Sequence, residues 1–180
     1  MSLLKIRVYG DPVLRLQADE VTTFGKPLED LARDMVETMI REDGIGLAAP
    51  QVGILERFLV IGIPGEKEDD PRRIFVFANP ETVEESDEKV VMEEGCLSLP
   101  GINEEVERPV RVVVQYQDLD GNELTLEADG LLARVVQHEI DHLDGVLIVD
   151  HIPALKRSML RARLKELEKE SSEMANSKRA

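Results

Sequence analysis

The chain has 180 residues, 42% of them hydrophobic, which is enough for one domain with a sizeable core and gives no reason to expect two. Its 22 basic and 37 acidic side chains give a net charge of −15. Because phosphate binding needs a basic surface, this charge argues against DNA or RNA as the direct substrate. The single cysteine excludes an internal disulfide and no apolar run is long enough to cross a membrane, so we expect a cytoplasmic protein without a membrane partner.

The first predicted element is a helix over residues 27–42, where apolar side chains recur at helical spacing and Gly44 ends the pattern. A short apolar run at 58–63 predicts a strand, and a second run at 74–77 predicts another. The Asn-Pro pair at 79–80 then predicts a break in the chain.

Segments 110–117 and 123–127 predict a hairpin, because the Asp-Gly pair at 120–121 between them is a strong turn signal. Two acidic runs, at 66–70 and 84–88, are predicted to be solvated loops or strand edges and not metal sites.

The C-terminal part of the chain predicts two helices. The first covers 131–143, with Asp129 as its N-cap and Gly145 as its C-terminal stop. The second is amphipathic and begins after Pro153. Residues from Ser171 onward are polar, and we expect them to fray.

The order of these elements is helix, several strands, then two helices. It indicates an α+β fold with antiparallel β-sheets packed around a central helix at 131–143, an N-terminal helix and a C-terminal helix. We expect residues 1–170 to form a single domain and 171–180 a frayed polar tail.

Residues 138–142 read His-Glu-Ile-Asp-His, which is an HExxH motif. On a helix this spacing places His138 and His142 on one face, close enough together to hold one metal ion. Glu139 then lies where it can take a proton from a water on that metal. The motif predicts a catalytic metal.

A catalytic metal of this type needs three protein ligands and an open position for water. Cys96 is the leading candidate for the third ligand, since a divalent metal would deprotonate its thiol. A buried small apolar residue is the alternative interpretation of a lone cysteine. The preceding Gly95 permits close backbone approach, and the flanking acids and serine are unusual around a core residue.

The third segment of interest, after the HExxH motif and the segment around Cys96, is glycine-rich and covers residues 44–53. Gln51 is its only side chain with both donor and acceptor groups, and its amide could donate to a developing oxyanion. A helix exit with a solvated glutamine is the alternative interpretation. The segment lacks the lysine and the spacing of a phosphate-binding loop.

Taken together, these three segments resemble those of peptide deformylases. That family carries a GxGLAAxQ segment, an EGCLS segment and an HExxH helix in this order, and here they stand at 44–51, 94–98 and 138–142. The flanking Gly-Leu-Leu-Ala at 130–133 and the amphipathic C-terminal helix also match, so the resemblance covers nearly the whole chain.

The resemblance implies an enzyme that removes the formyl group from the N-formylmethionine of newly synthesised polypeptides and releases formate. It implies that Cys96, His138 and His142 bind Fe²⁺, or Zn²⁺, Ni²⁺ or Co²⁺ in its place, with water in the fourth position. Glu139 would be the catalytic acid and base.

The resemblance also implies how the substrate is held. The side-chain amide of Gln51 and the backbone N–H of Leu97 would donate to the oxyanion. The peptide would lie as an added strand against the backbone near Ile45 and Gly95. The implied substrate-binding positions are Ile45, Gly46, Met92, Gly95, Leu131, Arg134 and Val135. Among them Arg134 is predicted to be a rim residue whose guanidinium reaches solvent.

Three further features have two interpretations each. Asp141 is either an anchor of the motif helix through a basic partner or an exposed helix acid. His151 matches no ligand position and is predicted to be structural or exposed. The basic residues between Lys156 and Lys165 are either a solvated helix end or a docking element for the ribosome.

Two rival functions use the same motif. A zinc endopeptidase also carries HExxH, and Glu166, downstream of His142, could be its third ligand. That function leaves Cys96 and the glycine-rich segment unexplained. A non-catalytic metal-binding protein is the other rival, although Glu139 and Gln51, which such a protein would not need, are both present.

Overall fold

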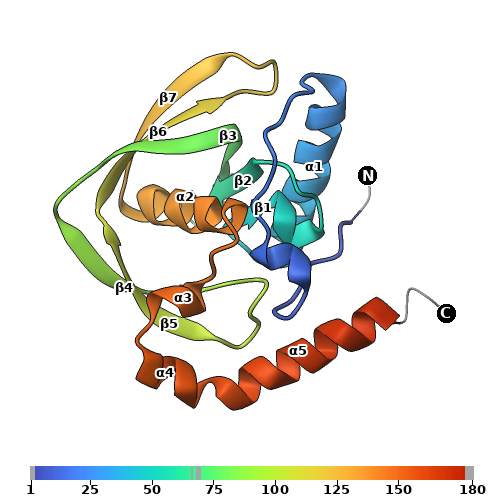
Figure 1. The fold of residues 1–180 in the computed structure, drawn as a ribbon. Helices are drawn as coiled ribbons and strands as arrows, with labels where there is room; N and C mark the ends of the chain where they lie inside the picture. Colours follow the sequence, from blue (N-terminus) through green and yellow to red (C-terminus); the bar gives the residue numbers. More distant parts are fainter. Residues whose placement is uncertain (1–2, 66, 68–69, 177–180) are drawn as a thin grey trace.

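The computed structural model describes residues 3–65, 67 and 70–176. In this part of the chain the strands form two antiparallel sheets, a larger one in the order β1-β2-β3-β6-β7 and a smaller one of β4 and β5 (Figure 1). The strands are β1 (Gly46–Ala48), β2 (Phe58–Ile63), β3 (Arg73–Glu85), β4 (Lys89–Gly95), β5 (Asn103–Pro109), β6 (Arg111–Gln117) and β7 (Glu123–Asp129). The helices are η1 (Pro12–Arg15), α1 (Lys26–Arg41), η2 (Ala49–Val52), α2 (Gly130–Leu143), α3 (Ile148–His151), α4 (Ala154–Met159) and α5 (Arg161–Asn176).

The motif helix α2 lies at the centre, with the larger sheet curving around it and the smaller sheet beside it (Figure 1). This arrangement confirms the predicted α+β fold with antiparallel sheets around the HExxH helix. The hairpin of β6 and β7 around Asp120 and Gly121 is confirmed as well. So is the N-terminal helix, α1.

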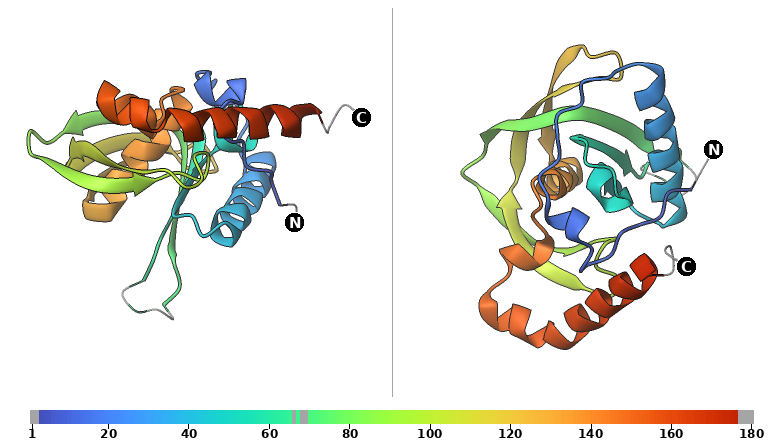
Figure 2. Two further views of the ribbon diagram at one scale, coloured as in Figure 1. Left: turned by 90° about the horizontal axis from the view of Figure 1, so that it is seen from below. Right: turned by 45° about the vertical axis from the view of Figure 1, so that its right-hand side comes forward.

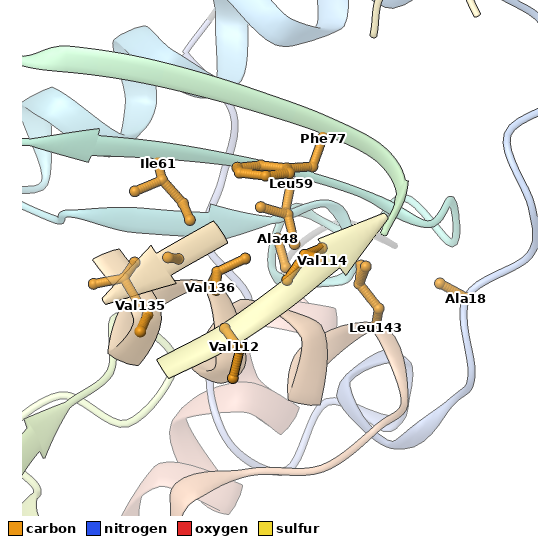
Figure 3. Packing of buried hydrophobic residues seen from close by; sticks show 12 residues of the cluster. Ala18, Ala48, Leu59, Ile61, Phe77, Val112, Val114, Val135, Val136 and Leu143 are labelled. Atoms are coloured by element: carbon orange, nitrogen blue, oxygen red, sulfur yellow. The ribbon is translucent and has the colours of Figure 1, made fainter. Parts of the chain in front are cut away.

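Strand β2 is covered on both faces, which explains its unbroken apolar sequence. Leu59 and Ile61 point toward α2 and pack with Val136 and Leu143 (Figure 3). The alternate residues, Phe58 and Val60, pack instead in the cluster that contains the apolar face of α1, namely Leu28, Ala32, Met35 and Met39. The sheet thus fixes α2 through a layer of side chains that exclude water.

The predicted break at residues 79–80 is wrong, because β3 runs through it. Asn79 adopts a positive φ of 51°, and the pairing with β6 shifts between Ala78 and Glu81. The strand therefore absorbs the Asn-Pro pair as a bulge and bends, and its first half pairs with β2 while its second half pairs with β6.

The single predicted C-terminal helix is divided into α4 and α5 at Leu160. Leu155 and Met159 on α4 are 75% and 76% exposed, whereas Leu164 and Leu167 on α5 are buried. Both views in Figure 2 show α5 running along the outside of the molecule. Helix α5 packs there against a cluster that includes residues of η1 and β5.

The predicted fraying from Ser171 is wrong as far as Asn176, since α5 continues to that residue and Ser171 itself is buried. Residues 177–180 of the predicted tail, and 66 and 68–69 of the first acidic run, lie outside the described residues.

No helix of the described chain combines the length and the apolar character that crossing a membrane requires.

Candidate active site

Helix α2 presents two imidazoles one turn apart on its inner face. The Nε2 atoms of His138 and His142 lie 3.2 Å from each other. Both rings are buried. Burial disfavours the imidazolium and holds the pKa of His142 well below its usual range, so this ring is neutral and its nitrogen lone pair is free to bind a metal.

Cys96 follows the last residue of β4 and brings a thiol to the same point. Its Sγ lies 3.2 Å from His142 Nε2, and the sulfur and the two imidazoles place their ligand atoms within 4.8 Å of one another. Zinc-type bonds of about 2.0–2.3 Å in tetrahedral geometry separate ligand atoms by roughly 3.3–3.8 Å. The donor set and its spacing therefore fit one divalent metal with an open position.

Glu139 lies between the two histidines, and its carboxyl group fills a gap that Gly46 leaves in strand β1. A Cβ at Gly46 would clash with that carboxyl group and with Val135. Oε2 of Glu139 is buried and has no hydrogen-bond partner among the described residues. Burial disfavours the carboxylate and raises the pKa of Glu139 to about 7, which suits a group that exchanges protons near neutral pH.

Gln51 is held in one orientation by short-range and long-range contacts. Its Oε1 accepts from the backbone N–H of Ala48 at 2.8 Å. Its Nε2 donates to Ser98 Oγ at 3.2 Å and lies 3.6 Å from Cys96 Sγ. The carbonyl end is therefore occupied by the backbone, and the amide donor faces the candidate ligand Cys96. Gln51 is also buried, which contradicts the interpretation of a solvated glutamine.

A buried ion cluster centred on Glu94 contacts one of the candidate ligands, His138. Arg108 donates two hydrogen bonds to the Glu94 carboxylate, at 2.6 and 3.0 Å. Glu94 Oε2 accepts in turn from His138 Nδ1 at 3.0 Å. Burial alone would raise the pKa of Glu94, but the hydrogen bonds and charges of His138 and Arg108 outweigh it and hold that pKa well below its usual range.

The hydrogen bond that His138 Nδ1 donates to Glu94 fixes the ring plane of His138, so that its Nε2 faces His142 Nε2, where a metal would bind. Burial alone would lower the pKa of His138, but hydrogen bonds with Cys96 and Glu94 raise it well above its usual value. The raised pKa favours a proton on Nε2 of His138, and a metal bound at Nε2 would replace this proton.

Arg134 is not a rim residue, and the prediction that its guanidinium reaches solvent is wrong. The residue is 5% exposed. Its Nη1 donates to Glu94 Oε1 at 2.6 Å and to the backbone carbonyl of Val106 at 3.0 Å. Its Nη2 donates to the backbone carbonyl of Val90 at 2.7 Å. Because Val90 lies on β4 and Val106 on β5, Arg134 ties α2 to both strands of the smaller sheet.

The structure selects one interpretation of Asp141. Its Oδ2 accepts from Arg108 at 2.8 Å and from His151 at 2.7 Å, so it is an anchor with basic partners. Neither Glu94 nor Arg108 is among the site residues that the sequence predicts. The sequence signals for them are weak: Glu94 is one of two acids before Gly95, and Arg108 ends an acidic stretch.

A cavity of ≈ 420 Å³ opens beside the proposed ligands and the Glu139 carboxyl group. Its wall includes all seven predicted substrate-binding residues together with Leu97 and Gln51. Met92 and Leu131 are 44% and 42% exposed, so apolar surface is offered to a ligand there.

Glu166, the third ligand of the endopeptidase rival, lies on α5 in an ion pair with Arg163.

Comparisons with known proteins agree with this geometry. The family model for polypeptide deformylase matches residues 3–158. A peptide deformylase of Brucella suis is 47% identical over 178 residues, 99% of each chain. The crystal structure of the peptide deformylase from Ehrlichia chaffeensis is 40% identical, with a TM-score of 0.85, covering 96% of this chain and 99% of that one.

A plant peptide deformylase, PDF1B, is similar over 98% of this chain and 95% of its own, with 38% identity and a TM-score of 0.90. The matches thus extend over nearly the full length of both partners, and they include the segments that carry the cysteine, the two histidines and the glutamate between them. The chain belongs to the peptide deformylase family.

Proposed function

We propose that this chain removes the N-formyl group from the N-terminal formylmethionine of newly synthesised polypeptides and releases formate. The observation that carries the proposal is the convergence of the ligand atoms of Cys96, His138 and His142 within 4.8 Å, beside the cavity that the Glu139 carboxyl group and the Gln51 side chain also line. One thiolate and two imidazoles suit Fe²⁺, Zn²⁺, Co²⁺ or Ni²⁺. We propose Fe²⁺ as the native metal.

Bound by these three residues, a divalent metal would act as a Lewis acid and lower the pKa of water. The Glu139 carboxylate accepts a proton from the attacking water at a carboxyl oxygen and delivers it to the nitrogen of the leaving amine. Gln51 Nε2 and the backbone N–H of Leu97 donate hydrogen bonds to the formyl oxygen as negative charge develops on it. The buried position of Glu139 excludes bulk water from this proton transfer.

We place the peptide between β1 and β4, as a strand added to their edges. Each of these strands pairs on one side only in the described chain, β1 with β2 and β4 with β5. The apolar wall residues Ile45, Met92, Leu131 and Val135 line the cavity that would receive the methionine side chain. Arg134 contributes by fixing Glu94 and the smaller sheet, and its charge is neutralised there.

Formate release tests the proposal directly. Protein loaded anaerobically with Fe²⁺ is expected to release formate from formyl-Met-Ala-Ser, and Glu139→Gln is expected to lower kcat by roughly 10²–10⁴-fold. The variant retains the shape of the side chain, so its thermal midpoint should not fall. Metal-loaded, folded protein that releases no formate would refute the proposal, and internal cleavage of unformylated peptides would support the endopeptidase rival instead.

We further propose that residues 1–170 act as one catalytic domain and that the enzyme works in the cytoplasm, where nascent chains emerge.

The native metal is testable by elemental analysis of protein purified without oxygen. An iron content near one atom per chain, replaced by zinc or lost on aerobic purification, would support Fe²⁺, because a ferrous thiolate site is sensitive to oxidation.

We propose that the start of the C-terminal helical segment docks on an anionic surface of the ribosome. Arg157, Arg161 and Lys165 line a groove on α4 and α5 in an otherwise acidic protein. Leu155 and Met159 are exposed beside them. The nearby Lys156 already pairs with acids of β5.

Charge reversal tests this docking better than truncation, because Leu164 and Leu167 of α5 are part of the core. Reversal of Arg157, Arg161 and Lys165 to glutamate should lower co-sedimentation with ribosomes and leave activity on short peptides unchanged. Lys169→Glu, one charge reversal on the same helix outside the groove, is the control, and it is matched in charge to each single reversal within the groove. Equal binding of the triple variant and the control would contradict the docking proposal.

A further inference from the structure

Five side chains form an unbroken series of hydrogen bonds from the protein surface to the proposed metal site. His151 Nε2 donates to Asp141 Oδ2 at 2.7 Å, and Arg108 Nη1 donates to the same oxygen at 2.8 Å. Arg108 also holds the Glu94 carboxylate, which accepts from His138 Nδ1. Side-chain exposure falls from 32% at His151 to 5% at Arg108 and Glu94, and it is 10% at His138, which lines the cavity. The outer end is therefore accessible and the middle of the series is buried.

The orientation of Arg108 depends on Asp141. Two nitrogens of the guanidinium, Nε and Nη2, donate to Glu94, and the third, Nη1, donates to Asp141. The plane of the guanidinium is thus set by two carboxylates on opposite sides. A displacement of the Asp141 carboxylate would rotate this plane and move the Glu94 oxygens that fix His138.

Asp141 itself needs a second donor to stay in place. Its side chain is 24% exposed, so the carboxylate can turn toward water when only Arg108 holds it. His151 approaches from α3, a different element, and binds the same oxygen. Two donors from two directions leave the carboxylate one orientation.

His151 is not needed to hold α3 against the rest of the molecule. Asp150 in the same helix pairs with Arg15 and accepts from the backbone N–H of Leu147. Ile148 and Val149 are buried in the core. Because the helix has these separate anchors, loss of the His151 ring should act on Asp141 more than on the position of α3.

We propose that His151 is a positioning residue of the metal site, which acts on His138 through Asp141, Arg108 and Glu94. The inference rests on the proposed function, because it needs His138 to bind the metal. His151 is neither among the candidate ligands nor among the residues that line the cavity. Its effect is to keep the His138 ring in the orientation that the metal requires, so its loss should appear first as faster metal release.

Release of Co²⁺ to an excess of chelator measures this effect, followed by the visible absorption of the cobalt-thiolate site. We expect His151→Ala to release Co²⁺ about 3- to 10-fold faster than the parent chain, below the roughly 10–100-fold effect typical of groups that contact a ligand directly. His151→Gln should restore release to within about 2-fold, because its amide nitrogen lies the same number of bonds from Cβ as Nε2 and can donate to Asp141.

Two further variants separate positioning from simple anchoring. Arg15→Gln breaks the neighbouring ion pair of α3 without touching Asp141, and it should leave Co²⁺ release unchanged. In an Asp141→Ala background, His151→Ala should add less than about 2-fold, because the two changes act on one path and are not additive. The thermal midpoints of the metal-free variants report folding independently of the metal.

The outcomes are distinguishable from failure of the proposed function. A parent chain that binds no Co²⁺ and releases no formate would refute the metal site itself. If the parent binds Co²⁺ and His151→Ala releases it at the parent rate, the positioning inference is wrong while the function stands. The inference is equally wrong if Arg15→Gln releases Co²⁺ as fast as His151→Ala. It is also wrong if His151→Ala accelerates Co²⁺ release as much in the Asp141→Ala background as in the parent chain.

Discussion

Gly46 and Glu139 are in such close contact that a Cβ atom on Gly46 would lie 2.2 Å from Glu139 Oε1. The contact joins β1, an edge strand, to the motif helix α2. A side chain of any size at this position would occupy the space of the carboxyl group, so the glycine and the glutamate depend on each other.

The substitution Gly46→Ala should therefore lower activity by displacing Glu139. The new Cβ would also lie 2.8 Å from Val135 Cγ1, and we expect a loss of about 1–3 kcal/mol in the free energy of unfolding, the usual cost of overpacking. Urea denaturation and formate release measure the two effects. Gly130→Ala is the contrast. The φ of +53° at this position strains an alanine, but no atom lies within 4 Å of the added Cβ, so stability should fall and activity should not.

Replacement of Gln51 by leucine should lower kcat by roughly 10²–10³-fold and leave KM nearly unchanged, as expected for loss of a donor that acts on the transition state. The backbone N–H of Ala48 would lose its acceptor, so a modest loss of stability should accompany it. Steady-state kinetics on a formyl-Met peptide separate the two constants. A rise in KM at constant kcat would show that Gln51 binds the ground state instead.

Arg134→Leu should destabilise the fold by about 3 kcal/mol, because it removes one partner of a buried ion cluster. It also leaves the backbone carbonyls of Val90 and Val106 without this donor. Arg73→Leu is the matched control, since Arg73 lies over the Phe75 ring at an exposed position and should cost less than about 1 kcal/mol. Comparable losses in the two variants, measured by urea denaturation, would contradict the role given to Arg134.

The pH dependence of stability should differ between the parent chain and Asp150→Asn. Burial favours the neutral form of Asp150, but the hydrogen bond and charge of Arg15 and the backbone N–H of Leu147 outweigh it and lower the pKa of the carboxyl group. A lowered folded-state pKa adds stability above the unfolded pKa of about 3.9, and this stability is lost as the pH falls through the folded pKa.

The parent chain should therefore be more stable than Asp150→Asn by roughly 0.2–1 kcal/mol at pH 7, the usual range for a partly exposed pair. The difference should hold down to about pH 5, begin to shrink near the unfolded pKa of about 3.9, and disappear as the pH falls through the lower folded-state pKa of Asp150. Urea denaturation between pH 7 and pH 3 measures it. If the stability advantage of the parent chain over Asp150→Asn grew as the pH fell, the prediction that folding lowers the pKa of Asp150 would be wrong.

The local elements were predictable because their signals are local. The spacing of His138 and His142 specifies one helix face, and the Asp-Gly turn at 120–121 specifies the hairpin of β6 and β7. Cys96 was predictable as the third ligand because it is the single cysteine and its neighbours are unusual for a core residue. Assigning Gln51 to the same site needed the family resemblance, since no spacing rule connects segments so far apart in the chain. The structure brings all of these groups to one cavity or its edge.

The supporting cluster escaped prediction because its contacts are long-range and its residues have unremarkable neighbours. Glu94 meets Arg108, Arg134 and His138, which come from β5 and α2. A buried arginine and an exposed one look alike in sequence, which is why Arg134 was predicted to reach solvent. Strand β4 was missed for a related reason: it is exposed along most of its length and has no apolar alternation.

The two strand edges that flank the cavity have a consequence for solubility. An unpaired β-edge can bind the edge of another copy as readily as it binds a substrate peptide, and flat exposed edges are frequent starting points for aggregation. Val91 and Met92 of β4 are exposed apolar residues of this kind. Acidic residues on the same hairpin, Glu93 opposite Glu105 and Glu107 opposite Val91, would repel a second copy. The negative charge of the chain would thus keep the proposed peptide-binding edge available in a concentrated solution of identical molecules.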